Sequence, residues 1–180
     1  MKYIKTYEQN NLQDSDRFIE AAKEGDLKVV KELLNQGIDV NIQDNGGYTA
    51  LIYASYNGHL EVVKELLKRS DIDVNIQDNN NNTALIWASY KGHLDIVKEL
   101  LKRSDIDVNI QDNFGNTALI WASRNGYLEI VKELLKRDEI DVNLKDDFFY
   151  YLNEDQKEEI MIEFPEQYQR YLIGKKASKY

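Results

Sequence analysis

The sequence predicts an all-α repeat fold, a solenoid of stacked helix-turn-helix units with short extended hairpin arms, capped at both ends. A pattern recurs in register along the chain, with Thr49, Thr83 and Thr117 at equivalent positions 34 residues apart. Each copy contains two short helical segments, and a polar arm that is too short for a helix follows them. One such unit cannot bury its own apolar face, so the copies are expected to stack.

Each full unit is expected to begin with a short helix, of which the first copy gives the example. The hydroxyl of Thr49 can cap this helix by accepting a backbone N–H from its first turn. Leu51, Ala54 and Ser55 are expected on its inner side. Gly58 ends the helix, since glycine adopts the left-handed backbone conformation at little cost.

The second helix of the unit has the sequence LEVVKELLKR in the first full copy. Leu60, Val63, Leu66 and Leu67 form an apolar stripe at helical spacing, and the Lys and Glu residues form the solvated face. The segment DIDVNIQDN that follows is expected to be an extended arm that leads to a turn. The helix pair and its arm therefore make one repeat.

The chain is expected to form a single domain over residues 14–174, between an N-terminal segment and a frayed tail. The expected segments are 1–13 (N-terminal segment), 14–45 (partial repeat), 46–79, 80–113 and 114–147 (full repeats), 148–174 (helical C-terminal cap) and 175–180 (tail). Ser15 or Asp16 is expected to cap the first helix.

The C-terminal cap is expected to contain two helices. Asn153 and Gln156 have the spacing of a capping box. Pro165 is expected to begin the last helix and Gly174 to end it. Apolar and aromatic side chains could cover the last repeat: Ile160, Phe164, Tyr168, Tyr171 and Leu172.

Four consecutive asparagines, residues 79–82, could form a disordered linker or an ordered turn. The repeat register passes through them without a slip, which favours the turn. Asn81 stands where the neighbouring copies have Gly47 and Gly115. A positive φ is therefore predicted at Asn81, because asparagine tolerates the left-handed conformation better than other non-glycine residues.

The order of motifs T-A-L, A-S-x-x-G-H, V-V-x-x-L-L and D-V-N resembles the ankyrin repeat, over about Asp16 to Asp147. The family usually has T-P-L-H where this chain has T-A-L-I, so Ala50 and Ile52 depart from the pattern. The resemblance implies that the protein binds another protein. In this family the partners usually contact the turn tips and the concave face of the first helices.

That surface coincides with the positions at which the copies differ, whereas framework positions must agree so that the units stack. Carried to this chain, it comprises Asn45, Tyr48, Tyr56, Asn57, Asn80, Asn82, Tyr90, Lys91, Phe114, Asn116, Arg124 and Asn125, with Trp87 and Trp121 beneath them. The aromatic ladder of Tyr53, Trp87 and Trp121 has two interpretations: packing between adjacent first helices, or rings that line the groove.

Composition limits the other function classes. Hydrophobic residues make up 42% and charged residues 31% of 180 residues, which is typical of a folded protein. There is no cysteine, so no thiolate site or thiol nucleophile exists. The segment MKYIKTYEQNNLQ lacks the apolar core of a signal peptide, and no stretch approaches the ~18 apolar residues of a membrane span. A cytoplasmic location without membrane contact is expected.

The net charge of -9 is concentrated in one segment, Asp138 to Glu166, which holds 11 acids and 2 bases. The remaining 21 acids and 21 bases balance. This distribution, with a pI of about 4.8, argues against nucleic acid as the main ligand. An alternative function is that of an inhibitor or immunity-type protein that masks a basic enzyme surface with this acidic segment.

Candidate catalytic or metal-binding residues are few. His59 and His93 share a repeat position without a catalytic partner, so a structural role in the turn is expected. Asp71 and Asp73 have the spacing that begins a calcium loop, but Ile76 replaces its essential glycine. The Asn of each D-V-N is expected to make a buried structural hydrogen bond.

The chain is therefore predicted to be a non-enzymatic monomer without cofactor or metal. An enzyme subunit remains an alternative, for which a pocket with a cluster of perturbed acids would be needed. A designed consensus array is a further alternative, and the divergent cap and uneven first repeat argue against it.

Overall fold

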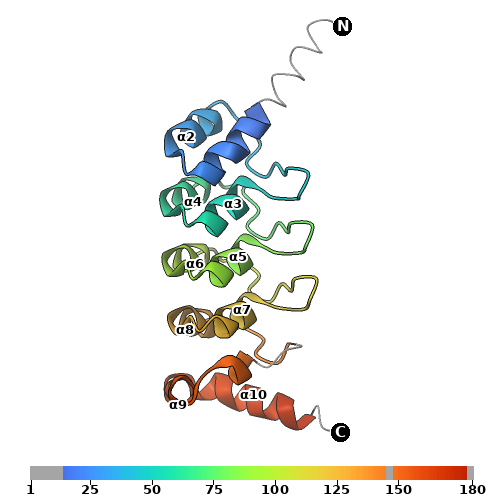
Figure 1. The fold of residues 1–180 in the computed structure, drawn as a ribbon, viewed down its shortest axis with the longest axis vertical. Helices are drawn as coiled ribbons and strands as arrows, with labels where there is room; N and C mark the ends of the chain where they lie inside the picture. Colours follow the sequence, from blue (N-terminus) through green and yellow to red (C-terminus); the bar gives the residue numbers. More distant parts are fainter. Residues whose placement is uncertain (1–13, 145–147, 178–180) are drawn as a thin grey trace, which may run out of the picture. The chain divides into compact units, whose positions relative to one another are not determined.

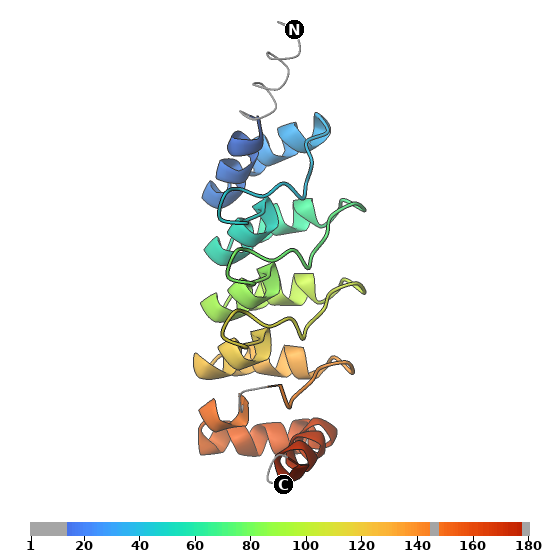
Figure 2. The ribbon, with the colours of Figure 1, turned by 90° about the vertical axis from the view of Figure 1, so that its right-hand side faces the viewer.

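The computed structural model describes residues 14–144 and 148–177, and the chain divides into two compact units between Ala84 and Leu85. The regular secondary structure of the described residues is helical, and the arms contain one isolated bridge, between Gln43 and Thr49. Within each unit the helix pairs form successive layers, one pair to a layer (Figures 1 and 2). The predicted solenoid of helix-turn-helix repeats is thus confirmed.

The first unit holds a helix over residues 14–24, followed by α2 (Leu27–Asn35), α3 (Ala50–Asn57) and α4 (Leu60–Leu66). The arm and tip loop between α2 and α3 project away from the helices (Figure 1). Thr49 caps α3 as predicted, because its hydroxyl accepts the Ile52 N–H at 3.1 Å. Gly58 follows α3 with φ of 83°, which confirms the predicted helix end.

Two details of the first unit differ from the predictions. Neither Ser15 nor Asp16 caps the first helix, because residues 14–24 are helical and both lie inside that helix. In α4 the buried residues are Val62, Val63 and Leu66, whereas Leu60 and Leu67 are only partly buried. The buried surface of α4 is displaced from the predicted stripe toward Val62, because α4 packs against both α3 and α2.

The second unit has the same architecture, with two repeats and a helical cap (Figure 1). Its elements are α5 (Ala84–Lys91), α6 (Leu94–Leu100), α7 (Ala118–Arg124), α8 (Leu128–Leu135), the 3₁₀ helix η1 (Phe148–Tyr151), α9 (Glu154–Glu163) and α10 (Pro165–Ala177). Thr117 caps α7 through the Ile120 N–H at 3.3 Å. The core includes Ile96, Leu100 and Leu134.

The C-terminal cap confirms some local predictions and corrects others. The side chain of Asn153 accepts the Gln156 N–H at 2.9 Å and that of Gln156 accepts the Asn153 N–H at 3.0 Å, so the capping box is present. Pro165 begins α10, but Gly174 does not end it, since the helix continues to Ala177. A Cβ at Gly174 would collide with the Asn143 side chain, so glycine allows close passage instead.

The tail predicted over residues 175–180 falls partly in α10, which includes 175–177, and residues 178–180 lie outside the described part. Phe148 and Phe149 of η1, an element that the sequence did not indicate, are buried. Their rings contact Tyr171 at centroid distances of 5.8 and 5.2 Å. Of the residues expected to cover the last repeat, Ile160 and Phe164 are buried, and Tyr168, Tyr171 and Leu172 are half-buried.

Lysines at equivalent positions of the second helices pair with carboxylates on the second helix of the following repeat. Lys31 lies 3.6 Å from Glu65 in the first unit, and Lys98 lies 3.8 Å from Glu133 in the second. Lys132, the next in this series, contacts Glu159 of α9 and pairs at 2.9 Å with Glu163, also of α9. Hydrogen bonds to these two glutamates raise the pKa of Lys132 above its ordinary value. The cap therefore supplies the acids that a further repeat would have supplied.

The asparagine run is an ordered tip loop. Asn81 has φ of 62°, against 78° for Gly47 and 83° for Gly115, which confirms the predicted positive φ. The Asn81 N–H donates to the Asp78 carbonyl at 2.8 Å, and the Gly47 N–H donates to the Asp44 carbonyl at 2.9 Å. The loops therefore share one backbone design.

Replacing Asn81 with valine is expected to lower the free energy of unfolding by about 1–2 kcal/mol, because a β-branched residue is strained at this φ. Glycine at the same position should leave stability unchanged or slightly higher. Urea unfolding followed by circular dichroism measures both. Asn80→Val is the control, since Asn80 is exposed in the same loop without a positive φ. Equal losses at the two positions would contradict the backbone explanation.

Candidate functional site

The tip loop of the first unit is organised around the carboxylate of Asp44. Its Oδ1 accepts the N–H groups of Gly46 at 2.8 Å and Tyr48 at 2.9 Å. Its Oδ2 accepts the hydroxyl of Tyr53, on α3, at 2.8 Å. The ring of Tyr48 stacks on that of Tyr53 with centroids 4.8 Å apart. Asp44 thus joins the tip loop to the first helix that follows it.

Asp112 has the same role in the second unit. Its Oδ1 accepts the N–H groups of Phe114 at 2.9 Å and Asn116 at 2.8 Å, and its Oδ2 accepts the Trp121 indole N–H at 2.9 Å. Tyr53 and Trp121 are half-buried rings whose polar ends donate to the aspartate of the tip loop that precedes their helix. Sequence reasoning missed these aspartates, although an Asp nine residues before the ladder aromatic recurs in every full copy.

Asn82 and Asn116 do not lie on the loop surface where the sequence analysis placed them. Their exposed fractions are 8% and 2%. The Asn82 amide donates to the Asp78 carboxylate at 3.3 Å, and the Asn116 amide donates to that of Asp112 at 3.1 Å. These two side chains hold the loop from beneath and are not available to a partner.

Aromatic side chains of α5 and α7 form a connected row in the second unit. The Tyr90 ring lies edge-on to Trp87 at 5.7 Å and edge-on to Trp121 at 5.0 Å between centroids. Edge-to-face pairs of this kind are favourable beyond the area that they bury. All three rings are half-buried, so they both pack on one another and keep an exposed edge. These contacts agree with packing between adjacent first helices, and the alternative, rings that line a groove, stays a prediction.

The row continues from α7 onto η1 through Arg124. Its guanidinium carbon lies 5.5 Å from the Trp121 ring centroid and 4.8 Å from that of Tyr151, and it donates to the Tyr151 hydroxyl at 2.8 Å. Tyr150 lies edge-on to Tyr151 at 5.4 Å and is 75% exposed. These residues are called the aromatic row: Trp87, Tyr90, Trp121, Arg124, Tyr151 and Tyr150.

Tyr150 and Tyr151 are not among the contact residues that the sequence predicts, because it predicts only a helical cap for their segment. Their only sequence signal is a pair of tyrosines directly after two phenylalanines. The structure separates the two pairs, with Phe148 and Phe149 buried and Tyr150 exposed.

The remaining candidates differ in exposure. Exposed ones are Asn45, Asn57, Asn80, Phe114, Arg124 and Asn125, and half-buried ones are Tyr48, Tyr56, Trp87, Tyr90, Lys91 and Trp121. Phe114 is 74% exposed at its tip loop. Two of the exposed amides bond within the chain: Asn57 donates to the Lys23 carbonyl at 3.0 Å and Asn125 to the Trp121 carbonyl at 2.8 Å.

Removal from water, together with the hydrogen bond to Asp44, raises the pKa of Tyr53 to about 12. Since the folded-state pKa lies above the ordinary value of 10.0, the associated stability is present below pH 10 and is lost as the pH rises toward 12. An absorbance titration at alkaline pH should therefore show a late tyrosine transition that Tyr53→Phe removes. Tyr56→Phe should leave that transition in place, and its disappearance in the control would contradict the assignment.

His59 and the D-x-D-x-N segments have structural roles. The His59 ring lies against Gly25, whose φ is 78°, and its Nε2 is 2.9 Å from the Lys23 carbonyl. Asp73 accepts the Asn75 N–H at 2.8 Å, as expected for an arm turn. The Asn41 side chain bonds to both the carbonyl of Asp71 and the N–H of Asp73, at 2.7 and 2.8 Å, although it is only half-buried.

Within residues 14–144 and 148–177, no group of three or more His, Asp or Glu side chains is placed to hold a metal ion. None of the helices in these ranges has the length and apolar character needed to cross a membrane.

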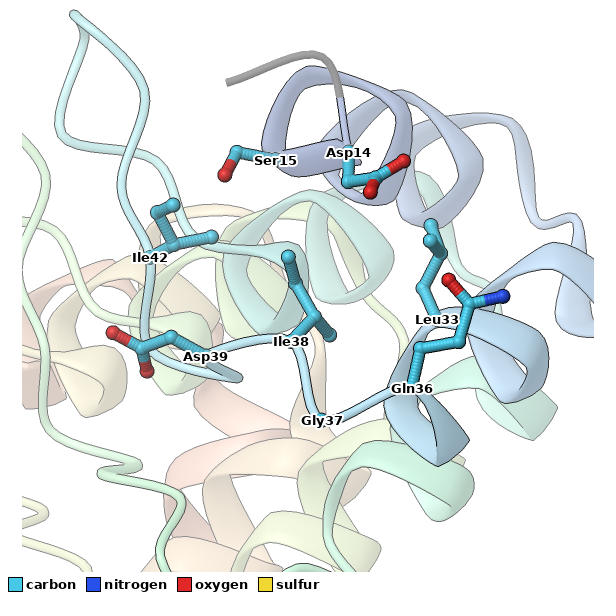
Figure 3. A pocket seen from close by; sticks show the side chains of 8 residues that line it. All are labelled: Asp14, Ser15, Leu33, Gln36, Gly37, Ile38, Asp39 and Ile42. Atoms are coloured by element: carbon cyan, nitrogen blue, oxygen red, sulfur yellow. The ribbon is translucent and has the colours of Figure 1, made fainter. Parts of the chain in front are cut away.

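A pocket of about 320 Å³ lies in the first unit, between the helix over residues 14–24, the end of α2 and the arm that follows (Figure 3). Leu33, Ile38 and Ile42 supply its apolar lining, and Asp14 and Asp39 supply carboxylates. None of its lining residues is a candidate contact residue. Its lining also includes the hydroxyl of Ser15, but no histidine or cation that would activate this hydroxyl, so the pocket indicates no specific chemistry.

Comparisons with known proteins agree with the repeat pattern. A family model described as ankyrin repeats (three copies) matches residues 18–112 and residues 70–146. Ankyrin repeat domain-containing protein 29 of Danio rerio is 50% identical over 48 residues, which are 26% of this chain and 16% of that protein. Human ankyrin repeat domain-containing protein 39 is 50% identical over 48 residues, which are 27% of this chain and 26% of that protein.

A plant relative is named for an enzymatic activity. The probable E3 ubiquitin-protein ligase XBOS33 of Oryza sativa subsp. japonica is 49% identical over 47 residues, which are 26% of this chain and 9% of that protein. The chain thus matches only a minor part of the length of each of these relatives.

Proposed function

Because the chain belongs to the ankyrin-repeat family, we propose that it is a non-enzymatic module that binds a partner protein through its first-helix face and tip loops. Ankyrin repeats are generally protein–protein interaction modules, and the family match covers the whole repeat region. The proposal includes a single domain over residues 14–174, a monomeric state and a cytoplasmic location.

The aromatic row is the observation that supports this face. Aromatic and arginine side chains dominate the energetics of protein interfaces, and they do so where they are partly buried and held in place. Trp121 is held by Asp112, and Arg124 is held by Tyr151. Phe114 and Tyr150 add exposed apolar area. The proposed contact set omits Asn82 and Asn116, whose side chains are buried.

The test replaces Phe114 and Tyr150 together with serine. These side chains are 74% and 75% exposed, so the melting temperature should stay unchanged. Affinity for a partner identified by affinity purification should fall about tenfold or more, since two interface anchors are lost. Tyr90 and Arg124 are less suitable, because both contact the half-buried ring of Trp121, which their replacement would expose further.

The matched control replaces Ile162 of α9 and Ile173 of α10 with serine. These side chains are 76% and 66% exposed and are not carried by the first helices or tip loops. The control variant should bind the partner at full strength. An equal loss of affinity in both variants would contradict the proposed face.

A second candidate function is an inhibitor or immunity-type protein that masks a basic surface with the acidic segment, residues 138–166. Glu158 is exposed and could take part, whereas Glu159 and Glu163 pair with Lys132. Replacing Glu154 and Glu158 with glutamine would test this function without breaking the Lys132 pairs. If partner binding by the wild-type chain depends strongly on salt and binding by this variant does not, the inhibitor function is favoured over binding through the aromatic row.

A further inference from the structure

The first helices of the second unit differ in charge from the second helices. The elements α5, α7 and η1 have the sequences ALIWASYK, ALIWASR and FFYY, with two cations and no acidic residue. By contrast, α4, α6 and α8 each carry two acids and one lysine. In a chain of net charge -9, these three elements are therefore locally basic.

The tip loop between α6 and α7 contains one acid, which does not change this sign on the surface, and Asp146 and Asp147, which precede η1 in the sequence, lie outside the described residues. Residues 112–116 have the sequence DNFGN, and Asp112 is 6% exposed. Its carboxylate faces inward, where it accepts the N–H groups of Phe114, Asn116 and the Trp121 indole. A partner that lies over this loop would meet the exposed Phe114 ring and backbone, not the carboxylate.

The two cations of this face are placed on aromatic rings. The Lys91 ammonium lies 5.4 Å from the Tyr90 ring centroid. The Arg124 guanidinium lies between the rings of Trp121 and Tyr151. Stacking on aromatic rings limits the positions of both groups, so less conformational entropy is lost when they bind an anion. A guanidinium that is held in this way can also form a two-point hydrogen bond with a carboxylate.

We propose that the aromatic row receives an acidic segment of the partner protein, in which carboxylates alternate with apolar side chains. The carboxylates pair with Arg124 and Lys91, and the apolar side chains pack on the exposed edges of Trp87, Tyr90 and Trp121. This inference rests on the proposed function and specifies the chemistry of the partner. Aromatic rings with cations also suit single-stranded nucleic acid, but the face has only two cations on a strongly acidic chain, which disfavours a polyanion.

The experiment uses the intrinsic fluorescence of the full chain, because its two tryptophans, Trp87 and Trp121, both belong to the aromatic row. The probes are a blocked peptide of repeated Glu-Leu-Gly triplets, the same peptide with Gln in place of Glu, and an oligouridine. The Glu peptide should give a saturable change in tryptophan fluorescence, and its affinity should fall as salt is added. The Gln peptide should bind about tenfold more weakly or worse.

Two double variants assign the binding to this face. Lys91→Gln with Arg124→Gln should remove the difference between the Glu and Gln peptides. Lys98→Gln with Lys102→Gln, an equal charge change on and just after α6, should preserve it. Arg124→Lys alone should give an intermediate affinity, because it keeps the charge and loses the planar fork. Circular dichroism checks that each variant is folded.

Equal binding of the Glu and Gln peptides would overturn the acidic preference and leave the protein-binding face standing. Tighter binding of oligouridine than of the Glu peptide would overturn the choice of a protein segment. If neither peptide gives a saturable change in the wild-type chain, the inference is wrong. Failure of the proposed function is a separate result, because it is measured with the identified partner and the Phe114 and Tyr150 variant.

Discussion

Replacing Phe148 with alanine is expected to lower the free energy of unfolding by about 3–5 kcal/mol, the usual cost of removing a buried aromatic ring. Phe148 is 1% exposed and its ring lies 5.8 Å from those of both Phe149 and Tyr171, between centroids. Since η1 also packs on α7, the cavity would open between the last repeat and its cap. Urea or thermal unfolding followed by circular dichroism measures the loss.

The control for this change lies two residues away in the same 3₁₀ helix. Tyr150 is 75% exposed, so Tyr150→Ala should change stability by no more than about 0.5 kcal/mol. The comparison keeps the backbone element constant and varies only burial. If the two variants lose similar stability, the cap does not share a core with the last repeat, and the role assigned to η1 is incorrect.

Replacing Asp112 with alanine is expected to lower the free energy of unfolding by about 3 kcal/mol, because several buried and part-buried donors lose a charged acceptor at once. The donors are the N–H groups of Phe114 and Asn116, the Asn116 amide and the Trp121 indole N–H. Asp112→Asn keeps the shape and one acceptor oxygen, so its cost should be smaller. Trp121 emission should shift to the red in both variants, since the indole gains access to water.

Asp105→Ala is the matched control for Asp112. The Asp105 side chain is 54% exposed and pairs with Arg103 at 2.7 Å, and an exposed ion pair contributes only about 0–1 kcal/mol. Hydrogen bonding to Arg103 holds the pKa of Asp105 below its ordinary value. If Asp112→Ala lowers the free energy of unfolding no more than Asp105→Ala does, the tip loop does not depend on the buried carboxylate of Asp112.

Much of the fold could be predicted because its determinants are local or periodic. The Thr49 cap and the Asn153 capping box each connect residues three positions apart. The positive φ of Asn81 followed from the alignment of the copies alone. The prediction for Gly174 failed because a glycine near a helix end has two uses, and the contact that selects between them comes from Asn143, far away in the sequence.

The candidate site was predicted in outline and corrected in detail. Exposed positions such as Phe114 and Arg124 were found because the copies differ there. Asn116 differs between copies as well, yet its amide bonds to Asp112 beneath the loop. Variation between repeats therefore identified the loop and not the direction of each side chain, which depends on the backbone geometry of the turn.

The sequence by itself determined the repeat, its helix pairs, most helix ends and the membership of the ankyrin-repeat family, because caps, turns and apolar periodicity act over a few residues or recur at a fixed spacing. Only the tertiary structure showed that Arg124 donates a hydrogen bond to Tyr151, 27 positions later in the chain, and that Lys132 donates one to Glu159. The cap has no repeat copy with which to align it. Its contacts therefore follow from how η1 and α9 pack on the last repeat, which no spacing in the sequence indicates.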